Sequence, residues 1–573
     1  MPKNVMKLLK PSPHRARNDF DLSHRHVLDA NFGELLPVSC IETVPGDTIV
    51  MHASDLLRNI PFVTSPFLRA RQHLDVWFVP YRDLWHQFDA FITRKKQPVS
   101  SAYNGANYLP WFRPYRVAYD LNQTSEAWTD IAGRPLTKRS LYLLELLGYG
   151  RQKYDSQRSM STNDPACNPF RLAAYNYIWY NEYRQQYYDD GMRLLNGSGS
   201  STYNNAAVLF NFDDLSCDTE AGAKLEIESG IDRRLLAMCQ MRYRTWKKDL
   251  FTGLLPSTQF GVLSTFGVNS IVTLLSQGES TSFPADAGVS NNGYLNNQNA
   301  NANGSRWELR GVSGQNSFDI LALRKSEAVQ IWRENALRAG NHIKDNMIAH
   351  YGVASDFQDH RPVYLGSVSA PLNISDVMAT ADTDSVVNGH VGSIAGKGLS
   401  SLSEKVFKYN AKEFGVIMVM FSILPEAEYD ADMFDRPNQL LDSEDFFIPE
   451  YENLGLEAVG KMSIFDAHSV STHNSVLGFA PRYYGYKTKL DKVFGEFVGT
   501  GVFRRWTSQR YDVASYFADL SPTVMPLQLL YVNPKIFDIN FNVGADVEPQ
   551  FLCDFYFDVD AVRPMSVTGM PFS

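Results

Sequence analysis

The run closest to a nucleotide-binding motif is a set of glycines around one lysine. Gly392-Ser-Ile-Ala-Gly-Lys-Gly398 combines small residues with a cation, which are the residue types that hold phosphate in a P-loop. A P-loop has four residues between its glycines and a serine or threonine after the lysine. Here three residues separate Gly392 from Gly396, and Gly398 follows the lysine. The spacing therefore argues against a nucleotide triphosphate site.

Two other patterns could hold a metal ion or a sugar. His24-Arg-His26 places two imidazoles on one side of an extended chain, but no His-Glu-x-x-His pattern accompanies them, and surface or interface histidines explain them better. A glycosidase needs two carboxylates several ångströms apart across a cleft, whereas acid pairs are also typical of solvated loop ends. The acid pairs of this chain include Asp189/Asp190, Asp213/Asp214 and Glu444/Asp445. With no Gly-x-Ser-x-Gly elbow either, the sequence predicts no catalytic residue, metal ligand or cofactor.

Aromatic residues mixed with arginines form the third candidate pattern. Trp111-Phe-Arg-Pro-Tyr-Arg116 and Arg242-Tyr-Arg-Thr-Trp-Lys-Lys248 could stack on single-stranded bases. The same residue types anchor protein interfaces and cores, and we favour this interpretation. The candidate subunit-interface or inner-surface anchors are Trp111, Arg113, Arg116, Trp179, Arg184 and Trp246.

The charge distribution confines any nucleic-acid contact to a small part of the chain. The formal net charge is −9, whereas a protein that only coats nucleic acid is expected to be basic. The first acid is Asp19, so residues 1–19 form a basic N-terminal arm; an ordinary chain terminus would explain the same charge. The candidate DNA contacts in this arm are Lys3, Lys7, Lys10, Arg15 and Arg17.

Cysteine usage and apolar runs indicate an intracellular protein. The 5 cysteines are odd in number and contain no Cys-x-x-Cys, so neither a disulfide framework nor a zinc site is predicted. The longest apolar run, 414–424, is about half of the roughly 20 residues that a spanning helix needs. Residues 5–9 are too short for the apolar core of a signal peptide. We expect neither export nor membrane insertion.

Strand-like patterns lie at both ends of the chain, and helical patterns lie in its middle. In 551–559 apolar and polar residues alternate, which places Phe551, Cys553, Phe555, Phe557 and Val559 on one face of a strand. Strands are predicted over 39–42, 48–53, 68–80, 414–424, 528–532 and 551–559. Helices are predicted over 82–91, 141–147, 169–187 and 317–339, and loops over 196–202, 278–314 and 379–403.

This order of elements favours one fold class. A doubly wound α/β fold would alternate strands and helices regularly, and this chain does not. We predict a mainly β protein, an eight-stranded antiparallel jelly roll of the viral capsid type whose large loop insertions contain α-helices. Division into separate domains is the alternative. The strand at 551–559 is expected to pair with strands near 40–80.

An ordered set of motifs covers nearly the whole chain. It includes Phe20-Asp-Leu-Ser-His24, Asp75-Val-Trp-Phe-Val-Pro80, Ala174-Tyr-Asn-Tyr-Ile-Trp-Tyr-Asn-Glu-Tyr-Arg184, Asp249-Leu-Phe-Thr-Gly-Leu-Leu-Pro256, Arg361-Pro-Val-Tyr-Leu-Gly366 and Ala561-Val-Arg-Pro-Met565. Together these motifs resemble the major capsid proteins of microviruses, the small single-stranded-DNA bacteriophages, and are nearest to the gokushovirus-like branches.

The resemblance implies a non-enzymatic virion protein. It implies 60 copies in a T=1 icosahedral shell around circular single-stranded DNA, assembled in the bacterial host cytoplasm. The implied partners are the genome, a small basic DNA-packaging protein, a DNA pilot protein and a host-cell surface receptor. A single capsid domain would span 20–573, with 257–316 as a surface protrusion loop for host attachment and 379–403 as a flexible loop. The rival hypotheses are a carbohydrate-active β-sandwich enzyme and a free-standing single-stranded-DNA binder.

Overall fold

The computed structural model describes most of the chain between residues 17 and 567. Its main gaps are 94–107, 205–211, 259–271, 277–287, 297–306, 312–319, 340–347, 353–360, 379–393, 465–475 and 508–526. The described residues fall into two compact units, one formed by 1–258 with 356–573 and the other by 259–355.

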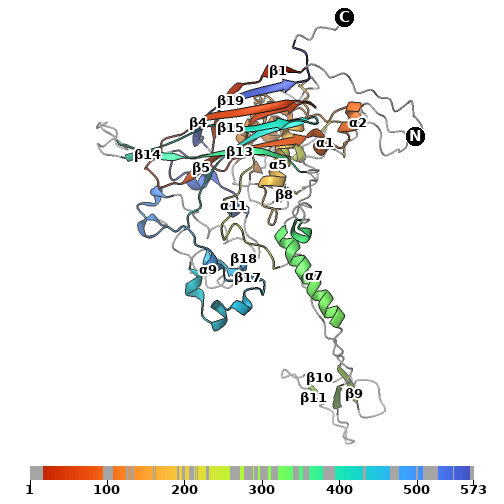
Figure 1. The fold of residues 1–573 in the computed structure, drawn as a ribbon, viewed down its shortest axis with the longest axis vertical. Coiled ribbons are helices and arrows are strands. Elements are labelled where there is room, and N and C mark those ends of the chain that lie inside the picture. The colour runs from red at the N-terminus through yellow and green to blue at the C-terminus, as the bar shows by residue number, and fades with distance from the viewer. Residues whose placement is uncertain are drawn as a thin grey trace, which may run out of the picture. The chain divides into compact units, whose positions relative to one another are not determined.

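Two antiparallel sheets build the first unit (Figure 1). The larger sheet has the order β1-β19-β4-β15-β14, and β2 also pairs with β19. Its strands are β1 (Asn18–Asp21), β2 (His24–Ala30), β4 (Thr48–Asn59), β14 (Asn373–Met378), β15 (Ile394–Asn410) and β19 (Phe551–Arg563). The smaller sheet has the order β13-β5-β16-β3, with β3 (Leu36–Thr43), β5 (Ala70–Pro80), β13 (Val363–Pro371) and β16 (Gly415–Pro425).

The connections between the sheets are those of a jelly roll. From β2 to β5 each successive strand enters the other sheet, and the same alternation returns for β15, β16 and β19. The predicted fold class, a mainly β protein of the viral capsid type with helical loops, is confirmed. The larger sheet has six strands, because β1 and β14 extend it beyond β2, β19, β4 and β15.

The alternation predicted for the last strand is confirmed. Phe551, Cys553, Phe555, Phe557 and Val559 are all buried. β19 pairs with β4, so that Phe555 lies beside Asp55, and it pairs on its other side with β2 and β1. The predicted pairing with 48–53 is therefore correct, whereas 39–42 and 68–80 belong to the facing sheet and pair with β16.

Helical insertions cover the outer face of the smaller sheet. Among these elements, α5 packs on β5 and β16, and α4 packs on β3. The strand β16 is consequently buried on both faces, which explains the unbroken apolar run predicted as a strand over 414–424. The helices are α1 (Tyr81–Leu84), α2 (Phe88–Thr93), α3 (Pro114–Gln123), α4 (Leu136–Leu146), α5 (Phe170–Ile178) with a π-helical turn at Trp179–Tyr183, and α6 (Arg233–Met238).

Short strands complete the first unit. β6 (Trp128–Thr129), β7 (Arg193–Asn196) and β8 (Ser201–Asn204) form a three-stranded sheet among the helices. β17 (Leu456–Gly460) and β18 (Val476–Pro481) form a hairpin in the long insertion between β16 and β19. That insertion also holds α9 (Tyr484–Lys487), α11 (Leu527–Leu530) and several 3-10 turns.

Several sequence-based element predictions are wrong. The loop predicted over 278–314 contains short strands at 288–289, 295–296 and 307–311, and the loop predicted over 196–202 ends inside a strand that begins at residue 201. Residues 528–532 form the helical turn α11 followed by a single bridge from Tyr531 to Thr245, not a strand. Residues 394–403 belong to β15, although they were predicted as part of a loop over 379–403; residues 379–393 lie outside the described residues. The strand requires a glycine at position 396, because a Cβ there would lie only 2.7 Å from the Thr64 carbonyl oxygen.

The second unit contains two small strand pairs and one long helix. β9 (Val272–Ser276) pairs with β12 (Trp307–Gly311), and β10 (Gly288–Val289) pairs with β11 (Leu295–Asn296). The helix predicted over 317–339 is α7 (Ile320–Ala339). Most of the predicted protrusion loop 257–316 falls in this unit, and its role stays a prediction. The predicted domain scheme, an arm over 1–19 and one domain over 20–573, also stays a prediction.

Candidate assembly surface

Exposed apolar side chains gather in the insertion between β16 and β19. This insertion follows a buried strand and consists mostly of short turns, including 3-10 turns at Arg436–Gln439, Ser443–Asp445, Pro449–Tyr451, Lys461–Ser463, Gly495–Phe497 and Arg504–Trp506. Contiguous exposed apolar side chains, unlike scattered ones, mark a surface for contact with another macromolecule. Those of this insertion include Phe434, Leu441, Phe446, Phe447, Leu454, Tyr486, Phe494, Val502 and Phe503.

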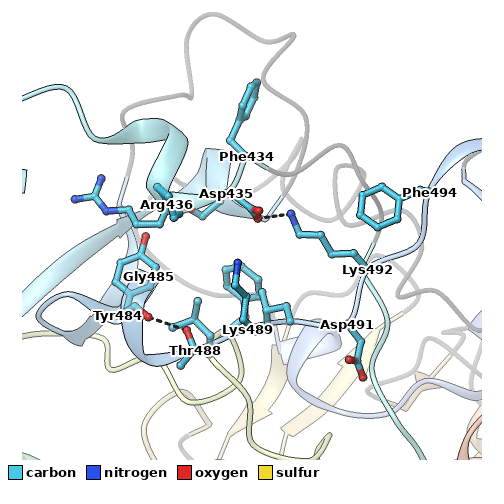
Figure 2. A pocket seen from close by; sticks show the side chains of 15 residues that line it. Phe434, Asp435, Arg436, Tyr484, Gly485, Thr488, Lys489, Asp491, Lys492 and Phe494 are labelled. Atoms are coloured by element: carbon cyan, nitrogen blue, oxygen red, sulfur yellow. Dashed lines mark hydrogen bonds and ion pairs between the residues drawn. The ribbon is translucent and has the colours of Figure 1, made fainter. Parts of the chain in front are cut away.

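A cavity of about 360 Å³ opens within this insertion (Figure 2). Phe434 and Phe494 line it and keep much of their own surface exposed, and Phe251 contributes a buried ring. Charged residues also line the cavity, namely Asp435, Arg436, Lys489, Asp491 and Lys492. A volume near the lower end of the range for ligand sites, roughly 300–1,000 Å³, suits one or two protein side chains.

Ion pairs hold the cavity wall together. The Lys492 ammonium donates to Asp435, and this hydrogen bond, together with the charges of Lys492 and Lys489, lowers the pKa of Asp435. Asp491 pairs with Arg69 at 2.5 Å, which ties the wall to the segment before β5. These ion pairs link the segments of the wall, and Lys489 adds a further cation to the lining.

Next to the cavity projects a short acidic turn, defined here as residues 441–447, Leu-Asp-Ser-Glu-Asp-Phe-Phe. The turn is held by its own capping box, in which the Asp445 carboxylate accepts from the backbone N–H of Asp442 at 3.2 Å. The same carboxylate also accepts from the backbone N–H of Leu441 at 3.0 Å. These hydrogen bonds lower the pKa of Asp445. Leu441, at the start of the turn, is 92% exposed.

An unusual backbone conformation supports the acidic turn. Tyr483 has a φ of 61°, the one positive φ among the described non-glycine residues. Its hydroxyl accepts from the backbone N–H of Ile448 at 3.2 Å, and its ring meets Phe447 edge-on at 5.2 Å. These contacts connect the end of the acidic turn to Tyr483, just after the end of β18.

Three of the six predicted interface anchors lie inside the protomer. Trp179 and Trp246 are 3% and 2% exposed, and the indole N–H of Trp246 donates to the Tyr531 carbonyl oxygen at 3.2 Å. Arg116 is buried and pairs with Asp120 at 2.8 Å. These three side chains are buried and make contacts within one protomer, and their predicted part in a subunit interface or inner surface stays a prediction.

The other three predicted anchors are partly accessible. Trp111 is half-buried, its indole N–H donates to the Glu220 carbonyl oxygen at 2.9 Å, and the Arg113 guanidinium lies 4.9 Å from its ring centre. Arg184 lies over the Tyr180 ring at 4.0 Å. Internal contacts thus engage all three residues, and their part in an interface stays a prediction.

Of the five cations predicted to contact DNA, the structure describes only the last one, Arg17. Lys3, Lys7, Lys10 and Arg15 lie outside the described residues, while Arg17 is exposed and its guanidinium lies near Gly46. The next residue, Asn18, pairs with Arg563 of β19, so Arg17 lies at this end of the larger sheet. Its contact with DNA stays a prediction.

The histidine pair lies on β2. His24 bonds to the Leu22 carbonyl oxygen at 2.8 Å and to the Ser39 hydroxyl at 3.0 Å, and His26 bonds to the Val38 carbonyl oxygen at 2.7 Å. Both rings also pack near Phe557. In the described part of the chain, no group of three or more His, Cys, Asp or Glu side chains is placed to hold a metal ion.

The acid pairs form no catalytic dyad among the described residues. Asp189 accepts from the Tyr531 hydroxyl at 2.8 Å inside the core, and Asp214 pairs with Arg234 at 2.7 Å. Asp190 and Asp213 lie outside the described residues. Glu444 and Asp445 belong to the acidic turn. Within the same described ranges, none of the helices is long and apolar enough to span a membrane.

Sequence reasoning missed the cavity and treated the acidic turn as a solvated loop end. A signal was present in the turn, where exposed apolar residues flank three acids with no intervening base. The cavity had a weaker signal, the lysines and aromatics of 484–494. These residues come together with 434–437 only through the folding of the insertion.

The jelly roll with helical insertions, together with a surface suited to protein contacts, defines a shell-building protein of the viral capsid class. The chain belongs to the family described as capsid protein (F protein), whose model matches residues 10–111 and 158–573. The resemblance seen in the motifs is thereby confirmed.

Named relatives support the same family. The chain is 23% identical to capsid protein VP1 of Chlamydia phage 1, over 98% of this chain and 96% of the relative. It is also 23% identical to capsid protein VP1 of Bdellovibrio phage phiMH2K over 98% and 96%, and 21% identical to that of Spiroplasma virus 4 over 97% and 95%. The chain is a structural capsid protein of the virion, not an enzyme.

Proposed function

We propose that 60 copies of this chain form a closed T=1 icosahedral shell around a circular single-stranded DNA genome. The observation that carries the proposal is the capsid family match, which includes every strand of both sheets. A jelly roll suits this role because its packed sheets give a rigid block whose loops are free to form contacts between copies. Assembly would take place in the bacterial host cytoplasm.

The basic arm is the proposed contact with the genome. Its cations precede the first acid of the chain, and Arg17 is exposed where the arm meets β1. Lysines and arginines neutralise phosphates without regard to base sequence. Because the whole chain carries a net charge of −9, we propose that a small basic DNA-packaging protein supplies most of the neutralisation.

Two further partners complete the proposal. We assign host attachment to the protrusion loop 257–316, whose many asparagines, serines and glycines suit an exposed tip that contacts a host-cell surface receptor. A DNA pilot protein is proposed to bind the assembled shell. The capsid family match supports the shell on which both of these proposed contacts depend.

Expression of the chain with its viral partners, followed by electron microscopy and nuclease treatment, tests the proposal. We expect closed particles of one size that protect single-stranded DNA. Persistent monomers or open aggregates would contradict shell formation. A triple variant with Lys3→Gln, Lys7→Gln and Lys10→Gln should form shells that protect less DNA. The matched control, in which the same three lysines become arginine, should protect as much DNA as the unmodified chain.

A further inference from the structure

The acidic turn carries unpaired negative charge beside exposed apolar surface. Asp442 and Asp445 are both engaged in the capping box that shapes the turn. Glu444 is exposed and has no ion-pair partner among the residues that the structure describes. Leu441 is almost fully exposed. Neither Leu441 nor Glu444 stabilises a free protomer in water. The leucine side chain stays in contact with solvent, and the Glu444 carboxylate has no nearby opposite charge among the described residues.

The cavity offers the complementary chemistry on the same insertion. Lys489 is exposed and lines the cavity. Its charge acts on Asp435, but no carboxylate of the described residues lies within ion-pair distance of it. Phe434 and Phe494, which are 47% and 64% exposed, provide apolar surface around it. A leucine side chain placed between these rings would bury apolar surface of all three residues.

One residue joins the two features into a single face. Arg436 lines the cavity, and its guanidinium lies 3.6 Å from the carboxylate of Asp445 in the acidic turn. The turn and the cavity are therefore neighbours on one protomer. A face that carries both a projection and the matching cavity is self-complementary, which is the property that a contact between identical subunits requires.

We propose that the acidic turn of one copy inserts into the cavity of a second copy, with Leu441 between Phe434 and Phe494 and Glu444 paired with Lys489. This inference rests on the proposed shell, since it names one of the subunit contacts that the shell needs. The occupant is a second copy because charge and shape complement each other within this one chain. An anionic host molecule in the cavity is the competing outcome.

Charge reversal tests the pairing. Glu444→Lys alone and Lys489→Glu alone should each place like charges at the contact and lower the yield of closed particles at least about tenfold, the change that corresponds to roughly 1.4 kcal/mol. The double variant restores opposite charges and should restore particles. Glu450→Lys, which reverses another exposed acid of the same insertion, is the matched control and should assemble normally.

The readouts are particle yield by electron microscopy and the melting temperature of the protomer. Because all three reversed positions are exposed, the melting temperature should not change, so a loss of particles reports on assembly rather than folding. The inference is overturned if either single reversal assembles like the unmodified chain, or if the double variant fails to recover. Failure of the unmodified chain to form particles would instead contradict the proposed shell itself.

Discussion

Phe421 of β16 and Phe555 of β19 meet edge-to-face between the two sheets, with ring centres 4.9 Å apart and ring planes at 73°. Both rings are 1% exposed. Because one ring belongs to each sheet, this pair joins the layers of the jelly roll directly. Edge-to-face geometry adds roughly 0.5–1.5 kcal/mol to the stabilisation from burial alone.

A charge at this pair should prevent the protomer from folding. Phe555→Asp would remove an aromatic contact and bury a carboxylate between the two sheets, a loss that we expect to exceed about 4 kcal/mol. The control is Tyr556→Asp, because Tyr556 is the next residue of β19 and is 49% exposed. Circular dichroism and solubility should separate the two variants. A soluble Phe555→Asp protomer with an unchanged melting temperature would refute the assigned role of the pair.

Asp55 of β4 should make the protomer less stable as pH rises. Its carboxylate accepts from the Gln72 side-chain amide at 3.0 Å, but burial is the larger influence and raises the pKa of Asp55 to about 6. In the unfolded chain the pKa of an aspartate is about 3.9. The folded state therefore binds more protons between these two values, so stability falls as pH rises from about 4 to about 6 and stays lowered above that range.

Asp55→Asn removes this titration and tests the assignment. The variant should be more stable than the unmodified chain at pH 7.5, by up to about 3 kcal/mol, and the difference should disappear near pH 4. Asp560→Asn on the exposed face of β19 is the control and should leave the stability unchanged both at pH 7.5 and near pH 4. Denaturant unfolding at several pH values measures the effect. An equal stability difference at pH 4 and pH 7.5 would show that Asp55 does not titrate as described.

Gly33 should tolerate no side chain. Its φ of +74° lies in the left-handed region, and a Cβ there would lie 2.5 Å from the Cβ of Val532. Gly33→Ala should therefore destabilise the protomer by more than the roughly 1 kcal/mol that backbone conformation alone costs. Gly495→Ala provides the comparison, because Gly495 has a φ of +68° and nothing within 4 Å of the added atom. Similar losses of melting temperature in the two variants would show that the contact with Val532 is unimportant.

The candidate site was only partly accessible to sequence reasoning. Aromatic and arginine residues were the candidate interface anchors, and Trp179 and Trp246 are buried within the protomer. The reason is that Trp and Arg serve cores and interfaces alike, so residue type does not reveal which surface is covered. The role proposed for the acidic turn depends on the neighbouring cavity, whose walls come from residues 250–251, 434–437, 463 and 484–494, which are distant in the sequence.

The sequence by itself determined those strands in which one face is apolar and the other is polar. The alternation in 551–559 predicted both the strand and its buried face, because side chains alternate across an extended backbone whatever they pack against. The tertiary structure decided which strands pair: β19 lies beside β4, whereas β3 and β5 lie in the facing sheet. The tertiary structure also decided that the polar, glycine-rich residues 394–403 form a strand. Backbone hydrogen bonds to β4 and β14 stabilise the extended conformation there, because the small side chains contribute little to it.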